Sequence, residues 1–140
     1  MAVTLSYNTS NQYESDVMRV YLRVTIGASG AVDAAYGGGV TSVVKESTAG
    51  QYSITLGDRF SRILAVQVTS VDDAAPAWAC ATVLEDPALI QSEFAADSTF
   101  VLQLYNGSFS ATNATSGSQL WIEITVASGN SPYDTYDFAP

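Results

Sequence analysis

Apolar residues recur at every second position along most of the chain, and this pattern constrains the fold more than any other feature. In residues 18–26, five apolar side chains alternate with polar or aromatic ones. Side chains of a β-strand point alternately to opposite faces of a sheet, so this period predicts a strand with one buried face. Further strands are expected at residues 51–56, 62–69, 77–84, 100–105 and 120–126, and weaker ones at 2–7 and 40–46.

The spacing of these runs indicates the fold class. Clusters of Gly, Asn, Asp and Ser separate them, as turns between short strands require. Strict alternation favours antiparallel pairing, because parallel strands buried on both faces read as continuous apolar runs. We therefore expect an all-β fold: a single antiparallel β-sandwich, jelly-roll-like, of about eight strands over residues 1–127. An immunoglobulin-like sandwich competes, but its Cys…Trp…Cys pattern is missing.

Several finer expectations follow from local signals. Residues 50–68 read as a hairpin whose turn is residues 57–61. Residues 86–95 hold the one helical signal, with Asp86 as a possible N-cap and Pro87 at the first helical position. In the run from 77 to 84, one face is expected to hold Trp78, Cys80, Thr82 and Leu84. The expected core comprises Val20, Leu22, Val24, Ile54, Leu64, Val66, Leu102, Ile122 and Ile124.

Composition argues against most enzyme and nucleic-acid-binding classes. The 140 residues include no His and one Cys, which removes histidine-based catalysis and thiolate metal sites. The formal net charge of −9 disfavours nucleic acid and anionic membranes as partners. Two adjacent acid pairs, Asp72-Asp73 and Glu85-Asp86, invite a calcium or acid–base interpretation, but solvated loops are the simpler one. We expect no catalytic, cofactor or metal site and no enzymatic activity.

Exposed aromatic and arginine side chains are the candidate interface residues. Arg19, Tyr21 and Arg23 form one outward row, which is either a solvated face or a contact for an acidic partner. Tyr105 and Trp121 also fall on the wet faces of their expected strands. Residues 128–140 have no strand period and are either a floppy chain end or, as we expect, an extended C-terminal arm that binds a neighbouring subunit. The aromatic side chains proposed as anchors on that arm are Tyr133, Tyr136 and Phe138.

Part of the chain resembles small virion proteins of tailed bacteriophages. In residues 45–70, KESTAGQYSITLGDRFSRILAVQVTS, a Gly precedes a strand, then L-x-D-[RK]-[FY], then a strand of L-x-V-x-V type. Residues 116–126 resemble the closing loop and strand of such chains. The resemblance implies a non-enzymatic capsid decoration, or cement, protein that binds the outside of a phage head and stabilises the shell. It also implies the major capsid protein as partner and a homo-oligomer, with a trimer favoured.

Two other functional classes remain open at this point. One is a receptor- or carbohydrate-binding β domain of a phage tail or fibre, in which Trp121, Tyr105 or Trp78 would stack on sugar. The other is a small hydrolase, which the absence of His disfavours. No apolar run is long enough to span a bilayer, and the N-terminal residues lack secretory-signal features. The resemblance implies that the protein belongs to the virion and lies on the capsid exterior.

Overall fold

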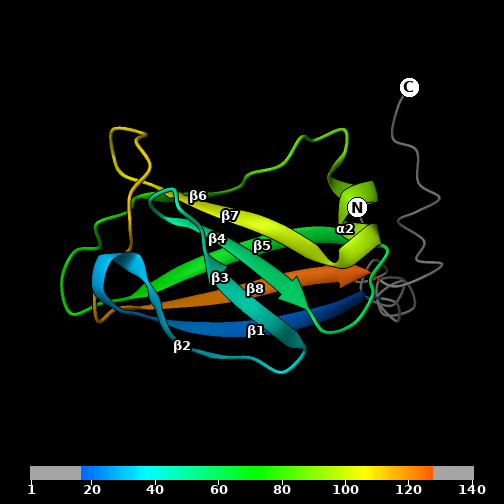
Figure 1. The fold of residues 1–140 in the computed structure, drawn as a ribbon, viewed down its shortest axis with the longest axis horizontal. Helices are drawn as coiled ribbons and strands as arrows, with labels where there is room; N and C mark the ends of the chain where they lie inside the picture. Colours follow the sequence, from blue (N-terminus) through cyan, green and yellow to red (C-terminus); the bar gives the residue numbers. More distant parts are fainter. Residues whose placement is uncertain (1–16, 128–140) are drawn as a thin grey trace, which may run out of the picture.

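A computed structural model describes residues 17–127 of the chain, and within them almost every element is a β-strand (Figure 1). The expected strand at residues 2–7 and the expected arm at 128–140 lie outside the described residues. The elements, in chain order, are β1 (Val17–Ile26), the 3-10 turn η2 (Ala28–Gly30), β2 (Val32–Tyr36), β3 (Val40–Lys45), β4 (Gln51–Leu56), β5 (Arg62–Val71), β6 (Cys80–Val83), α2 (Ile90–Asp97), β7 (Thr99–Tyr105) and β8 (Gln119–Ala127).

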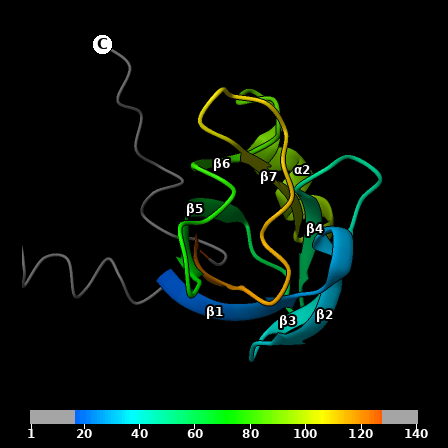
Figure 2. The same ribbon diagram turned by 90° about the vertical axis from the view of Figure 1, so that its left-hand side faces the viewer.

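The eight strands form two antiparallel sheets of four, which confirms the expected all-β sandwich. The first sheet has the order β2-β1-β8-β5 and the second the order β3-β4-β7-β6. In the end view of Figure 2, β2 and β3 lie together at one side of the sandwich, and β5 and β6 lie at the opposite side. The helix α2 has eight residues, so no helix in the described part is long and apolar enough to cross a bilayer.

The core lies between the sheets and is built from the inward residues of the alternating strands. Most of the expected set is buried, with exposed fractions of 4% or less: Val20, Leu22, Val24, Ile54, Leu102, Ile122 and Ile124. Val66 is partly buried and packs against this cluster. Tyr52 is also buried, and its hydroxyl donates a hydrogen bond to the carbonyl of Gly30, 2.7 Å away.

The expected hairpin over residues 50–68 is wrong. Strand β4 pairs with β3 and β7, whereas β5 pairs with β8, so the connection passes from one sheet to the other. Phe60 is buried in this connection, and the next amide, that of Ser61, donates to the carbonyl of Ala127 on β8. Burial of this aromatic side chain separates the strands and makes the segment a corner between sheets.

The expected position of Leu64 in the core is also wrong. A β-bulge between Ile63 and Ala65 leaves Leu64 without a partner on β8, and Ile63 takes the buried position instead. The side chain of Gln91 on α2 accepts from the Ile63 amide at 2.9 Å and donates to its carbonyl at 2.8 Å. A bulge adds one residue to a strand, so the period of two read from the sequence is displaced at this point.

Around β6, the expectation that Trp78 shares a face with Thr82 and Leu84 is also wrong. Ala81 and Val83 pack against the core, while Thr82 and Leu84 are exposed. Trp78 is buried, but it precedes the four-residue strand and reaches the core from a loop. The alternation of buried and exposed side chains within β6 therefore cannot be extrapolated from the buried position of Trp78.

Two further elements depart from expectation at their boundaries. The helix begins at Ile90 rather than just after Asp86, but the Asp86 carboxylate accepts a hydrogen bond from the amide of Ala88, as the side chain of an N-cap residue does. Strand β2 was not expected. Two of its five residues are Ala, and a run of Gly residues follows the strand. Gly37, at its end, packs so closely on β1 that a Cβ atom there would lie 2.7 Å from the carbonyl oxygen of Tyr21.

Candidate functional site

The outer face of the β2-β1-β8-β5 sheet collects the exposed aromatic and arginine side chains. Strand register places Arg23 opposite Tyr36 of β2 on one side and opposite Trp121 of β8 on the other. Two residues before Arg23 on β1, Tyr21 lies opposite Glu123 of β8. Directly opposite residues in a sheet have Cβ atoms about 4.5–5.5 Å apart, so these side chains form one continuous surface. We call Tyr21, Arg23, Tyr36 and Trp121 the outer patch.

The centre of the outer patch is a contact between a cation and an aromatic ring. The guanidinium carbon of Arg23 lies 4.6 Å from the ring centre of Trp121. The indole Nε1 donates to the side-chain oxygen of Gln119 at 3.0 Å, which holds the ring in place along β8. Trp121 is nevertheless 45% exposed, so much of its surface is open to a partner.

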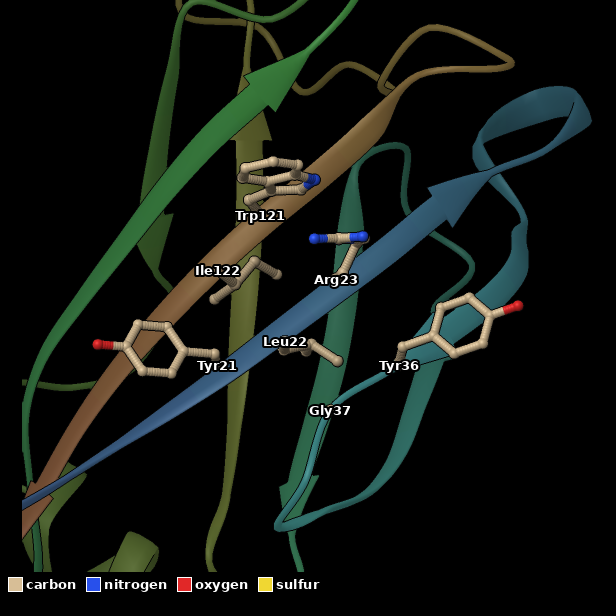
Figure 3. A pocket seen from close by; sticks show the side chains of 7 residues that line it. All are labelled: Tyr21, Leu22, Arg23, Tyr36, Gly37, Trp121 and Ile122. Carbon is tan, nitrogen blue, oxygen red and sulfur yellow. The ribbon is translucent and has the colours of Figure 1, made fainter.

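A shallow hollow of about 460 Å³ lies within the outer patch. Figure 3 shows Tyr21 and Tyr36 at opposite ends of it, with Trp121 and Arg23 between them. The two tyrosines are 61% and 67% exposed, and both carry a free face for contact. A phenol ring offers apolar surface and a hydroxyl that donates or accepts, so the hollow is suited to a ligand that is partly apolar and partly polar.

Charge along the same face alternates in sign. Arg19 Nε lies 3.4 Å from a carboxylate oxygen of Glu123, in an ion pair between β1 and β8. Because the Arg19 side chain is 62% exposed, water screens this pair and it adds little to stability. Two of the five basic residues of a strongly acidic chain thus lie on this face. This placement favours a partner that presents carboxylates next to apolar groups.

The structure therefore brings together four of the residues predicted from the sequence, Arg19, Tyr21, Arg23 and Trp121. Tyr105 belongs to β7 in the other sheet and does not join them. Tyr36 completes the outer patch but was missed, because β2 was not expected. A signal was present, since Val32, Ala34 and Tyr36 alternate with a period of two before the glycines. The arm residues Tyr133, Tyr136 and Phe138 lie outside the described residues.

The two acid pairs lie apart, and neither is part of the outer patch. Asp72 and Asp73 follow β5 and border a second hollow with Ser116 and Gln119. Among residues 17–127, no group of three or more acidic or Cys side chains is placed to hold a metal ion. Glu85 lies before α2, where burial, a side-chain hydrogen bond with Glu93 and the nearby charge of that residue raise its pKa.

Comparison with known proteins gives no relative: no family model, no curated protein and no solved structure matches this chain. The surface chemistry of the outer patch and the resemblance noted in the sequence are therefore the grounds for a functional proposal.

Proposed function

We propose that this chain is a non-enzymatic structural protein of a phage virion, a decoration protein that binds the outside of the head and stabilises the shell. The observation that best supports this proposal is the outer patch, where Arg23 lies over Trp121 between two exposed tyrosines. Trp, Tyr and Arg are the residue types that contribute most of the binding energy at protein interfaces. An interface for a protein partner would bury this surface.

The proposed partner is the major capsid protein, and charge supports a position outside the shell. The net charge of −9 gives no attraction to packaged DNA. Although the chain is acidic, the outer patch carries the cation of Arg23 beside aromatic rings, and Arg19 lies next to it. We propose that it meets an apolar capsid surface flanked by carboxylates. A homo-oligomer, with a trimer favoured, and the C-terminal arm at residues 128–140 belong to the same proposal.

A carbohydrate-binding domain of a tail or fibre is the second candidate. The hollow between Tyr21 and Tyr36 favours it, because aromatic faces stack on sugar rings and phenol hydroxyls bond their polar edges. Trp121 is the one indole available for this role, because Trp78 is only 9% exposed. Arg23 covers the Trp121 ring, so a sugar would have to displace it.

The experiment that separates these candidates is co-sedimentation of the full chain with empty, expanded heads assembled from the major capsid protein of the same genome. The proposal predicts saturable binding at fixed sites, and a bound chain that a membrane-impermeant amine label or an added antibody can reach on DNA-filled heads. Labelling only after the heads are opened would contradict the exterior position. No binding to heads, together with quenching of Trp121 fluorescence by an oligosaccharide, would favour the second candidate.

A further inference from the structure

The two sheets meet closely at one side of the sandwich and stay apart at the other. At the β2–β3 side the chain passes directly from sheet to sheet through residues 37–39. At the opposite side, β5 and β6 leave a hollow of about 230 Å³ between them. We call this hollow the β5–β6 seam. Its lining comes from both sheets and from the loop before β6, and its apolar side chains include Val66, Val68, Trp78, Ala81, Val83 and Leu102.

Three buried polar atoms have no hydrogen-bond partner among the described residues. Two of them are donors on segments that border the β5–β6 seam: the indole Nε1 of Trp78, which lines the seam and is 9% exposed, and the hydroxyl of Ser70, which lies further along β5. The third is the Oδ2 atom of Asp72, just after β5. Ser70 has the same strand parity as Val66 and Val68, which line the seam. Buried donors in folded proteins are almost always paired, so these two indicate that an acceptor-bearing segment belongs at the seam.

Strand β5 is also an unprotected edge in the described part of the chain. It is the last strand in the order β2-β1-β8-β5, so alternate amides and carbonyls along its free side have no strand partner there. Gln91 satisfies both backbone groups of Ile63, and the bulge follows at once. The edge that stays open runs from residue 65 to residue 71, next to the seam.

We propose that residues 2–7 of this same chain add to β5 as an antiparallel strand and close the seam. In this segment, AVTLSY, the apolar side chains Val3, Leu5 and Tyr7 alternate with Ala2, Thr4 and Ser6. Its six residues are nearly as many as the seven of the open edge. In the proposed strand, Val3, Leu5 and Tyr7 face the seam, and the backbone carbonyls of the segment accept the hydrogen bonds that the buried donors lack. This proposal does not depend on the proposed function.

The position of the chain before β1 makes this pairing reachable. Val17 and Arg62 both lie opposite Ala127, so β1 and β5 start at the same end of the sheet. An added strand beyond β5 lies three strand spacings from β1, about 14 Å. Residues 8–16 can span about 30 Å when extended, which is ample. A segment that returns from that end must run opposite to β5, hence the antiparallel direction.

Native-state hydrogen exchange of the full chain, followed by NMR, tests this proposal with two matched variants. Leu5→Asp and Thr4→Asp add the same charge one residue apart, on opposite faces of the proposed strand. In the unsubstituted chain, the amides of residues 65–71 that point away from β8 should be protected. Leu5→Asp should speed their exchange at least about tenfold, and Thr4→Asp less than about twofold. Slow amide exchange in β8 shows that each variant is folded. If Leu5→Asp is unfolded, Leu5→Ser takes its place.

Acrylamide quenching of Trp78, measured in a Trp121→Phe background, provides a second readout and should increase with Leu5→Asp only. Unprotected edge amides in the unsubstituted chain would overturn the proposal. Equal effects of the two Asp variants would overturn it as well. Exchange rates should not depend on protein concentration. If dilution alone removes the protection, a second copy supplies the strand and the pairing within one chain is wrong.

Discussion

The guanidinium of Arg23 lies 4.6 Å from the ring centre of Trp121, on two strands in which these residues are direct register partners. Ninety-eight positions separate them in the chain, so their contact depends on the whole β1–β8 ladder. The contact fixes the orientation of two exposed side chains before any partner binds. A side chain held in one orientation loses less conformational entropy on binding, which is why this pair is central to the proposed interface.

The first prediction concerns the strength of this contact. An exposed cation–π contact contributes about 0.5–1 kcal/mol. A double-mutant cycle with Arg23→Gln and Trp121→Leu, measured by urea unfolding, should give a coupling energy in that range. Arg19→Gln with Trp121→Leu is the matched control and should couple by less than about 0.5 kcal/mol, the limit of ordinary additivity. Equal coupling in the two cycles would show that the Arg23 contact is not formed in solution.

The second prediction concerns Gly50, where the backbone has a φ of +67°. A Cβ atom there would overlap the carbonyl oxygen of Thr112. Gly50→Ala should lower the free energy of unfolding by at least about 2 kcal/mol, because left-handed strain and a backbone clash add. Gly38→Ala is the control, since nothing lies within 4 Å of its added Cβ. Thermal unfolding of both variants measures the difference, and equal melting temperatures would contradict this description of Gly50.

The third prediction concerns the attachment of α2 to β5. Gln91→Ala removes both hydrogen bonds to the backbone of Ile63, and it should cost about 1–3 kcal/mol of stability because a part-buried amide and carbonyl lose their partners. Ser92→Ala, at the next and exposed position, should change stability by less than about 0.5 kcal/mol. Urea unfolding of the two variants compares them directly. A Gln91→Ala variant as stable as the parent would mean that the bulge holds without the helix.

The fourth prediction concerns alkaline pH. Burial raises the pKa of Tyr52 to about 12, whereas a tyrosine in an unfolded chain titrates near 10. Between these values the unfolded chain has lost a proton that the folded chain keeps. Stability from this group is therefore full below pH about 10 and is lost as pH rises toward 12. At about 1.36 kcal/mol per pKa unit, the loss is at most about 2.7 kcal/mol.

Tyr52→Phe is the control for this pH dependence. The variant lacks the titrating hydroxyl and also its hydrogen bond to Gly30, so it should be less stable at neutral pH. Its stability should then fall less steeply between pH 10 and 12 than that of the parent. Parallel curves for the two proteins, measured by denaturant unfolding across this range, would contradict the raised pKa.

Much of the fold follows from local pattern, and the errors have physical causes. Strands β1, β4, β7 and β8 were predicted because their alternation is unbroken. The hairpin at residues 50–68 was wrong because the burial of Phe60 depends on the opposite sheet. Leu64 was misplaced because a bulge shifts the period by one residue. In each case the decisive contact is with a segment that is distant in the sequence, which a local pattern does not contain.

The candidate site was predictable in its parts but not as a whole. The outward row on β1 and the exposed position of Trp121 follow from alternation alone. The pairing of Arg23 with Trp121 requires the register of β1 against β8, and the contribution of Tyr36 requires that β2 pair with β1. Register is set by how the two sheets bury their inner faces together, so one strand considered alone cannot specify it.

We propose that the outer patch is the capsid-binding surface, and a binding titration with two exposed-aromatic variants decides whether it is. Trp121→Ala removes the centre of the patch, whereas Phe109→Ala removes a side chain that is 80% exposed on a loop elsewhere. After matched thermal unfolding shows that both are folded, each is titrated onto empty heads of the same phage. We expect Trp121→Ala to bind with a Kd about thirtyfold weaker, as for an interface residue that contributes about 2 kcal/mol, and Phe109→Ala to bind with an unchanged Kd. Parent-like binding by Trp121→Ala would contradict this proposal.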